Sequence, residues 1–158
     1  MPTLTGTRGG ADFPVGGFGE GSTLKVAWGS YTLAANPTQN DVIRFCKVPA
    51  KALVLGGFVQ GKDIDTGTEA FDLDIGWLAN GVEVADTDGF GNFGVWTGDA
   101  VTDVRPEVGV YFPLGGVLFT TGPQKFSAET VIAGLVNAAA NATGTGIITV
   151  VLFYVLEY

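Results

Sequence analysis

Short runs of β-branched and aromatic residues, interrupted by turn residues about every ten positions, are the main feature of this sequence. Runs such as "TLKVAWGSYTLAA", "VIRFCKVP" and "EAFDLDIGWLA" alternate with segments rich in glycine, asparagine, aspartate and proline. Glycine fills 25 of the 158 positions. Because glycine is costly inside helices and strands but permissive in turns, this share predicts many short connections. The pattern therefore predicts an all-β fold, a β-sandwich or jelly-roll-like arrangement of about 8–10 strands.

The chain has the length of one domain with a hydrophobic core. We expect a single β-sandwich domain over residues 22–158, preceded by an extended, glycine-rich N-terminal arm over residues 1–21. The arm contains seven glycines, two prolines and the isolated Phe13 and Phe18, with no sustained period. Two states of the arm stay open at this point, because chain termini are often loose unless they are tied down: a disordered segment, and a segment docked on a neighbouring subunit.

Proline and glycine predict where strands end and bend. Pro49 cannot donate to a strand ladder, so the run "VIRFCKVP" should end there. A Gly-Gly pair inside "KALVLGGFVQGKDI" predicts a bulge within one long strand. The Asn-Gly pair at 80–81 predicts a hairpin between the apolar runs on either side.

Other segments are assigned from composition and alternation. The charged segment "KDIDTGTE", residues 62–69, predicts a hairpin tip, and the runs at 93–97 and 115–122 predict strands. Residues 127–142 fit either a strand or a short helix, with the strand favoured. The last run, residues 145–158, is apolar on both parities, which is typical of a central strand covered on both faces.

The charge of the chain excludes several classes of partner. Its formal net charge is -8, and the eight lysines and arginines are scattered along the sequence. Proteins bind nucleic acids largely by neutralising phosphates with Lys and Arg, so we expect no direct nucleic-acid partner. The same charge would repel anionic membranes, and the sequence shows neither a secretory signal nor an apolar run long enough to cross a bilayer. We expect a protein made in a cytoplasm, with no membrane partner.

The sequence contains no histidine and a single cysteine. The absence of histidine removes His-based general bases, Ser-His and Cys-His nucleophiles, and imidazole metal sites. Cys46 lies in the apolar run "DVIRFCKVP" and is interpreted as a buried structural thiol. We expect no enzyme activity, no catalytic residues and no cofactor.

Two carboxylates in "AFDLDIGW", Asp72 and Asp74, are the first candidate site. In a strand, residues two positions apart lie about 6.5 to 7 Å from each other on one face, a separation that overlaps the acid pairs of inverting glycosidases. A catalytic pair also needs a cleft and one raised pKa. The favoured interpretation is therefore a water-facing side of a strand whose large apolar residues face the core.

The acidic stretch "DTDGFGN", residues 86–92, is the second candidate site. Asp86, Asp88 and Asn92 could offer oxygen atoms to calcium, but the third acid and the final glutamate of an EF-hand loop are missing. We favour a glycine-rich acidic turn without a metal. A calcium-assisted carbohydrate-binding or receptor-binding module, lectin-like or from a tail fibre, stays as the alternative function, with three candidate exposed aromatic residues: Trp96, Phe90 and Phe93.

Residues 40–77 resemble a pattern of small structural proteins encoded in the head modules of tailed bacteriophages. The shared features are a strand ending at Val48-Pro49, a small-residue turn, a strand over 54–58, a tip at Asp65-Thr66 and a strand closing on residues 75–77. The resemblance covers about a quarter of the chain. The stretch from Gly81 to Asp103 departs from the pattern.

This resemblance implies a capsid decoration (cement) protein, often trimeric, that sits on the outer shell of the virion. The implied partners are the major capsid protein and further copies of this chain in a homotrimer. The leading hypothesis is a non-enzymatic virion structural protein that binds the assembled capsid lattice and stabilises the head. A hydrolase that uses Asp72 and Asp74 is the third hypothesis.

Overall fold

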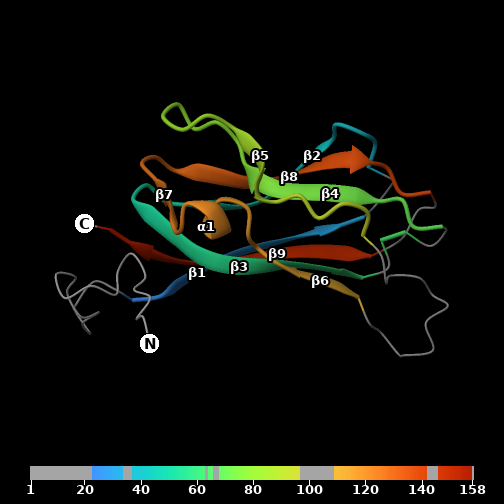
Figure 1. The fold of residues 1–158 in the computed structure, drawn as a ribbon, viewed down its shortest axis with the longest axis horizontal. Coiled ribbons are helices and arrows are strands. Elements are labelled where there is room, and N and C mark those ends of the chain that lie inside the picture. The colour runs from blue at the N-terminus through green and yellow to red at the C-terminus, as the bar shows by residue number, and fades with distance from the viewer. Residues whose placement is uncertain are drawn as a thin grey trace, which may run out of the picture.

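The structure is a computed structural model, and it describes residues 23–33, 37–62, 64–65, 68–96, 109–141 and 146–157. The predicted arm at 1–21 lies outside these residues. The described residues form nine strands and one helical turn in two stacked layers (Figure 1). In chain order they are β1 (Lys25–Thr32), β2 (Val42–Val48), β3 (Ala52–Lys62), β4 (Asp72–Trp77), β5 (Asp86–Gly91), β6 (Val110–Pro113), α1 (Val117–Thr120), β7 (Gln124–Phe126), β8 (Thr130–Ala138) and β9 (Ile147–Leu156).

Each layer is an antiparallel sheet. Sheet A has the strand order β1-β9-β3-β6, with β7 also paired to β3, and sheet B has the order β2-β8-β4-β5. The chain crosses between the layers at most connections, so strands that are neighbours in one sheet are distant in sequence (Figure 1). This interleaving is the arrangement expected of a jelly-roll-like sandwich. The structure thus confirms the all-β sandwich.

The core lies between the sheets and follows the alternation of the strands. Aromatic side chains make its largest contacts. The Trp77 ring of sheet B packs edge-on against Phe90 and against Phe126, which comes from β7 of sheet A, with centroid distances of 5.1 and 5.3 Å. At another place in the core, Phe71 and Trp96 meet edge to face at 5.7 Å.

The two sheets also meet along one side, where β1 approaches β2. Gly29 of β1 faces inward, and a Cβ atom added there would lie 1.9 Å from the carbonyl oxygen of Phe45 in β2. Only glycine allows this approach of two backbones. The "AWGSY" segment therefore needs its glycine for contact between the layers.

Several predicted features are confirmed. The run at 127–142 forms a strand, β8, rather than a helix. The ladder between β3 and β9 shifts register between Val54 and Gly56, which is the predicted bulge in one long strand. The strands β4 and β5 pair antiparallel around the Asn-Gly turn, where the backbone N–H of Asn80 donates to the carbonyl of Glu83.

Three local predictions are wrong. Residues 115–122 contain the helical turn α1 instead of a strand, and the consecutive Val117 and Leu118 both pack on the core, as side chains in a strand do not. In the run 93–97, the described residues pair only through a single bridge at Val95. The segment 62–69 is no hairpin tip, because β3 and β4 belong to different sheets.

Candidate functional site

Asp72 and Asp74 lie on β4 opposite the core side chains of the same strand, as the alternation predicts. The prediction that this face meets water is wrong for Asp74, which is only 4% exposed. The chain itself covers this face. A Cβ atom added to Gly76 would lie 2.0 Å from the carbonyl oxygen of Asp86, and Val95 forms a bridge with Asp72. The segment 86–95 therefore runs beside β4, as its neighbour β5 and through the bridge at Val95, and at Asp86 its backbone also closes off the outer side of Gly76.

Burial changes the electrostatics of this carboxylate cluster. One oxygen of Asp74, Oδ2, accepts a hydrogen bond of 2.6 Å from the Nδ2 atom of Asn137. The Oδ1 atoms of Asp72 and Asp74 are buried without a hydrogen-bond partner. Desolvation raises the pKa of Asp74, and the charges of Asp72 and Asp88 add to this rise, while the bonds from Asn137 and from the Phe93 backbone oppose it. The pair is enclosed, so in this structure the Asp74 carboxylate is out of reach of a substrate.

The calcium candidates lie on a strand rather than around a loop. Asp86 and Asp88 belong to β5, and Asn92 follows it, with its Oδ1 accepting a bond of 3.3 Å from the Gly94 N–H. Desolvation and the hydrogen bond and charge of Asp88 raise the pKa of Asp86. Within the described residues, no three side chains of His, Cys, Asp or Glu are grouped closely enough to hold a metal ion.

The aromatic residues offered as a carbohydrate platform are largely in the core. Phe90 and Trp96 are fully buried, and the Trp96 Nε1–H donates to the carbonyl oxygen of Leu73 at 3.1 Å. Phe93 is half-buried and stacks on Phe112 with a centroid distance of 5.0 Å. The prediction of exposed aromatics at these positions is wrong for Phe90 and Trp96, because both rings lie in the core, where Phe90 packs on Phe126 and Trp96 packs on Phe71.

Cys46 is half-buried on β2 and packs against the core. Burial raises the pKa of its thiol to about 11, so at neutral pH it stays protonated and is a poor nucleophile. Within the described chain no helix is long and apolar enough to span a bilayer.

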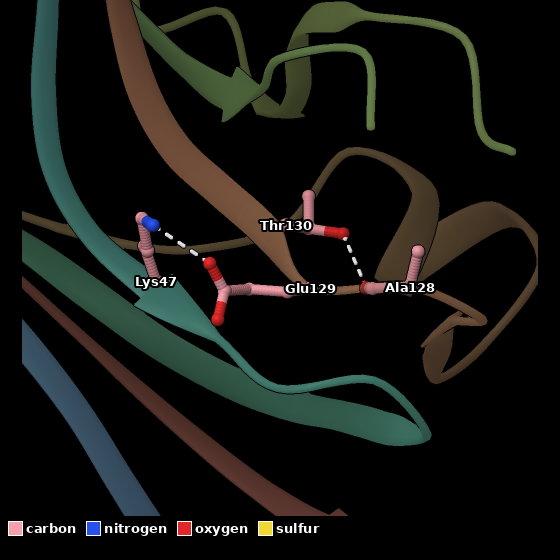
Figure 2. Close-up of polar contacts among 4 residues, drawn as sticks. All are labelled: Lys47, Ala128, Glu129 and Thr130. Carbon is pink, nitrogen blue, oxygen red and sulfur yellow. Dashed lines mark hydrogen bonds and ion pairs between the residues drawn. The ribbon is translucent and has the colours of Figure 1, made fainter. Parts of the chain in front are cut away.

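An ion pair lies at the rim of sheet B. Figure 2 shows the ammonium group of Lys47 on β2 donating to Glu129, just before β8, at a distance of 2.7 Å. Beside it, the Thr130 hydroxyl donates to the carbonyl oxygen of Ala128 at 2.9 Å (Figure 2). The ion pair joins the end of β2 to the start of β8, and the hydroxyl bond is local to the start of β8.

The outer surface of sheet A is different, because its outward side chains are large and apolar. On β1 the exposed parity carries Val26 and Trp28, and Trp28 is 66% exposed. Tyr111 on β6, at the other side of the sheet, is 60% exposed. We name the outward side chains of β1, β9, β3 and β6 the outer A face. Sequence alternation along β1 shows that these residues share one face of the strand, but it does not show which face of the strand points outward.

The comparisons with known proteins support the fold. No protein-family model matches the sequence, and no curated protein matches it significantly. Among solved structures, a chain of the cyanophage Pam1 capsid asymmetric unit is similar, with a TM-score of 0.66 and 22% identity, over 99% of this chain and 100% of that one.

Two further solved structures share the fold. A chain of the capsid of Ralstonia phage GP4 has a TM-score of 0.65 and 20% identity, over 92% of this chain and 90% of that one. A chain of the acidic stable capsid of Helicobacter pylori bacteriophage KHP30 has a TM-score of 0.52 and 13% identity, over 88% and 97%. These three solved chains thus come from phage capsids, and each match covers at least 88% of this chain and at least 90% of the other.

Proposed function

We propose that this chain is a non-enzymatic structural protein of a tailed-bacteriophage virion. In this proposal it decorates the capsid: it binds the outer surface of the assembled major capsid lattice as a homotrimer and stabilises the head. The observation that carries the proposal is the structural similarity, over nearly the whole chain, to chains of three phage capsids. A match over nearly the whole of a small chain favours a similar structural role over a segment shared with proteins of unrelated function.

The chemistry of the chain supports a binding role. The Asp74 carboxylate is buried by the chain itself, and the sequence offers no histidine to activate a nucleophile. A net charge of -8 favours solubility in a protein displayed in many copies, and it keeps the chain from binding nucleic acid. The resemblance over residues 40–77 spans β2, β3 and β4, which contribute to both layers of the sandwich.

The experiment is to measure the protein on purified DNA-filled heads of the phage that encodes it. Mass spectrometry should find it at a fixed ratio to the major capsid protein, and a side-chain-resolution map should place it on the outer shell. Heads prepared without it should release DNA at a lower temperature and regain stability when the purified chain is added. Absence from virions, with abundance in infected cells, would contradict the proposal.

A further inference from the structure

The outer A face is a continuous apolar surface across four strands. In the strand register, Trp28 of β1 lies opposite Val151 of β9, which lies opposite Phe58 of β3. The Phe58 ring then contacts Tyr111 of β6 and Phe153 of β9, with centroid distances of 5.1 and 6.3 Å. Apolar side chains thus run from one side of the sheet to the other, with Trp28 and Tyr111 exposed and Val151, Phe58 and Phe153 half-buried.

A row of polar residues borders the aromatic side chains. Ser30 and Thr149 share a hydrogen bond of 2.8 Å between their hydroxyl oxygens, and Gln60 is the next residue in the same row. Beyond this row is an open hollow of about 390 Å³, with Tyr111, Ile147 and Lys62 in its lining. The face therefore has the apolar centre and polar rim of a protein interface.

The charges of the two sheets are divided unevenly. The strands of sheet A contain no aspartate or glutamate, whereas the strands of sheet B contain four aspartates. Glu157, the residue after β9, is paired with Lys125 of β7 at 2.6 Å. In a protein of net charge -8, the described strands of this face thus carry no carboxylate that would repel another acidic surface.

We propose that the outer A face is the contact between copies of this chain, and this inference rests on the homotrimer of the proposed function. In a ring of three copies the contact is heterologous, so the β1 side of the face, with Trp28, would pack on the β6 side, with Tyr111, of the next copy. A second copy fits because the described strands of both sides carry no carboxylate, and the aspartates of sheet B stay outside the contact. A basic partner surface would be attracted instead to the four aspartates in the strands of sheet B. The strand β9 supports this assignment, because it is apolar on both parities but the described chain covers only its inner face.

The test is sedimentation of the purified full chain over a concentration series, with the variants Trp28→Asp and Tyr111→Asp. The matched control is Phe119→Asp, since Phe119 on α1 is 78% exposed and lies outside the outer A face. The wild-type chain and the control should sediment as trimers. Both face variants should sediment as monomers at the same concentrations while keeping the wild-type circular dichroism spectrum. If one of them fails to fold, the other decides the result.

Acrylamide quenching gives a second readout, because Trp77 and Trp96 are buried and Trp28 is the exposed indole. Quenching should fall as the concentration rises and the trimer forms. Trimers that persist in both face variants would overturn this inference and leave capsid binding untouched. A wild-type chain that is monomeric at every concentration would also overturn the inference. This holds whether acrylamide quenches Trp28 in that monomer or residues 1–22 shield Trp28 from the quencher. Binding of such a monomer to heads would show that the capsid role stands without this contact.

Discussion

The two sheets share one pattern of alternation but differ in what lies over their outer faces. On sheet B, the outward residues of β4 include Asp72 and Asp74, and the chain buries Asp74 and one carboxylate oxygen of Asp72. On sheet A, the outward residues of β1 and β6 include Trp28 and Tyr111, and no described segment covers them. Thus polar residues are buried where the chain folds over itself, and apolar residues are exposed on the opposite layer.

This arrangement inverts the usual relation between polarity and exposure. A strand pattern tells which residues share a face, but what covers that face is decided by segments far away in the sequence. An exposed aromatic row then marks a place for a further protein, and a buried acid marks a place where folding carries an electrostatic cost. The two sheets share the core that lies between them, and they differ in their outer faces.

The largest effect is expected in the shared layer, for Phe126→Ala. Phe126 belongs to sheet A, is fully buried and packs on Trp77 and Phe90 of sheet B. Removing its ring leaves a cavity between the sheets, so the free energy of unfolding should fall by about 3 to 5 kcal/mol. Chemical denaturation measures the change, and Phe119→Ala, at an exposed ring, should stay within about 0.5 kcal/mol. Equal losses in the two variants would show that the rings do not differ in burial.

The next largest loss of stability is expected for Gly29→Ala, at the contact between β1 of sheet A and β2 of sheet B. The new Cβ atom would lie 1.9 Å from the carbonyl oxygen of Phe45, so β1 and β2 must move apart. We expect a loss of about 1 to 3 kcal/mol in the free energy of unfolding. Gly56→Ala is the matched control, since a Cβ atom at Gly56 meets nothing within 4 Å. A neutral Gly29→Ala would mean that the two strands are farther apart than described.

Much of the fold could be predicted because it depends on local pattern. The bulge near Gly56, the end of β2 before Pro49 and the central position of β9 all follow from residue types at fixed positions. The strand predicted over 115–122 was wrong because short apolar runs fit both periodicities. Only the contact of both Val117 and Leu118 with the core distinguishes a helical turn there.

The candidate site was predicted less well, and the reason is physical. The spacing of Asp72 and Asp74 correctly placed both on the side of β4 away from the core. It could not show that Asp74 is buried on that side, because the burial depends on residues distant in sequence, such as Asn137 of β8, which donates to Asp74. Phe90 and Trp96, which the sequence suggested as exposed aromatics, are buried in the core for the same kind of reason: their partners Phe126 and Phe71 lie on other segments.

The covered face of sheet B is tested by Asp74→Asn. Because burial raises the pKa of Asp74 in the folded state, wild-type stability should be highest below the unfolded pKa and fall as the pH rises through the folded one. The variant has no carboxyl group at this position, so its stability does not fall with pH for this reason, and its amide oxygen can still accept the hydrogen bond from Asn137. It should equal the wild type near pH 3 and exceed it by about 1 to 2 kcal/mol at pH 7.

Denaturant titrations at several pH values measure this difference. Glu129→Gln, at an exposed carboxylate beside sheet B, is the control and should show no such growth with pH. A variant that is less stable than the wild type at pH 7 would contradict the prediction. It would indicate that the ionised carboxylate is compensated, for example by a bound cation, and a chelator titration of the wild type would then identify that cation.

The smallest effects are expected where the two sheets are alike, at one exposed ion pair on each. Lys47 pairs with Glu129 beside sheet B, and Lys125 pairs with Glu157 beside sheet A. Each pair should show a coupling energy below about 1 kcal/mol in a double-mutant cycle of Lys→Met and Glu→Gln, because both partners are solvated. High salt should remove the coupling. If the Lys125 pair alone kept its coupling in high salt, it would be less exposed to solvent than the Lys47 pair. A neighbouring copy bound at the rim of the outer A face would have this effect.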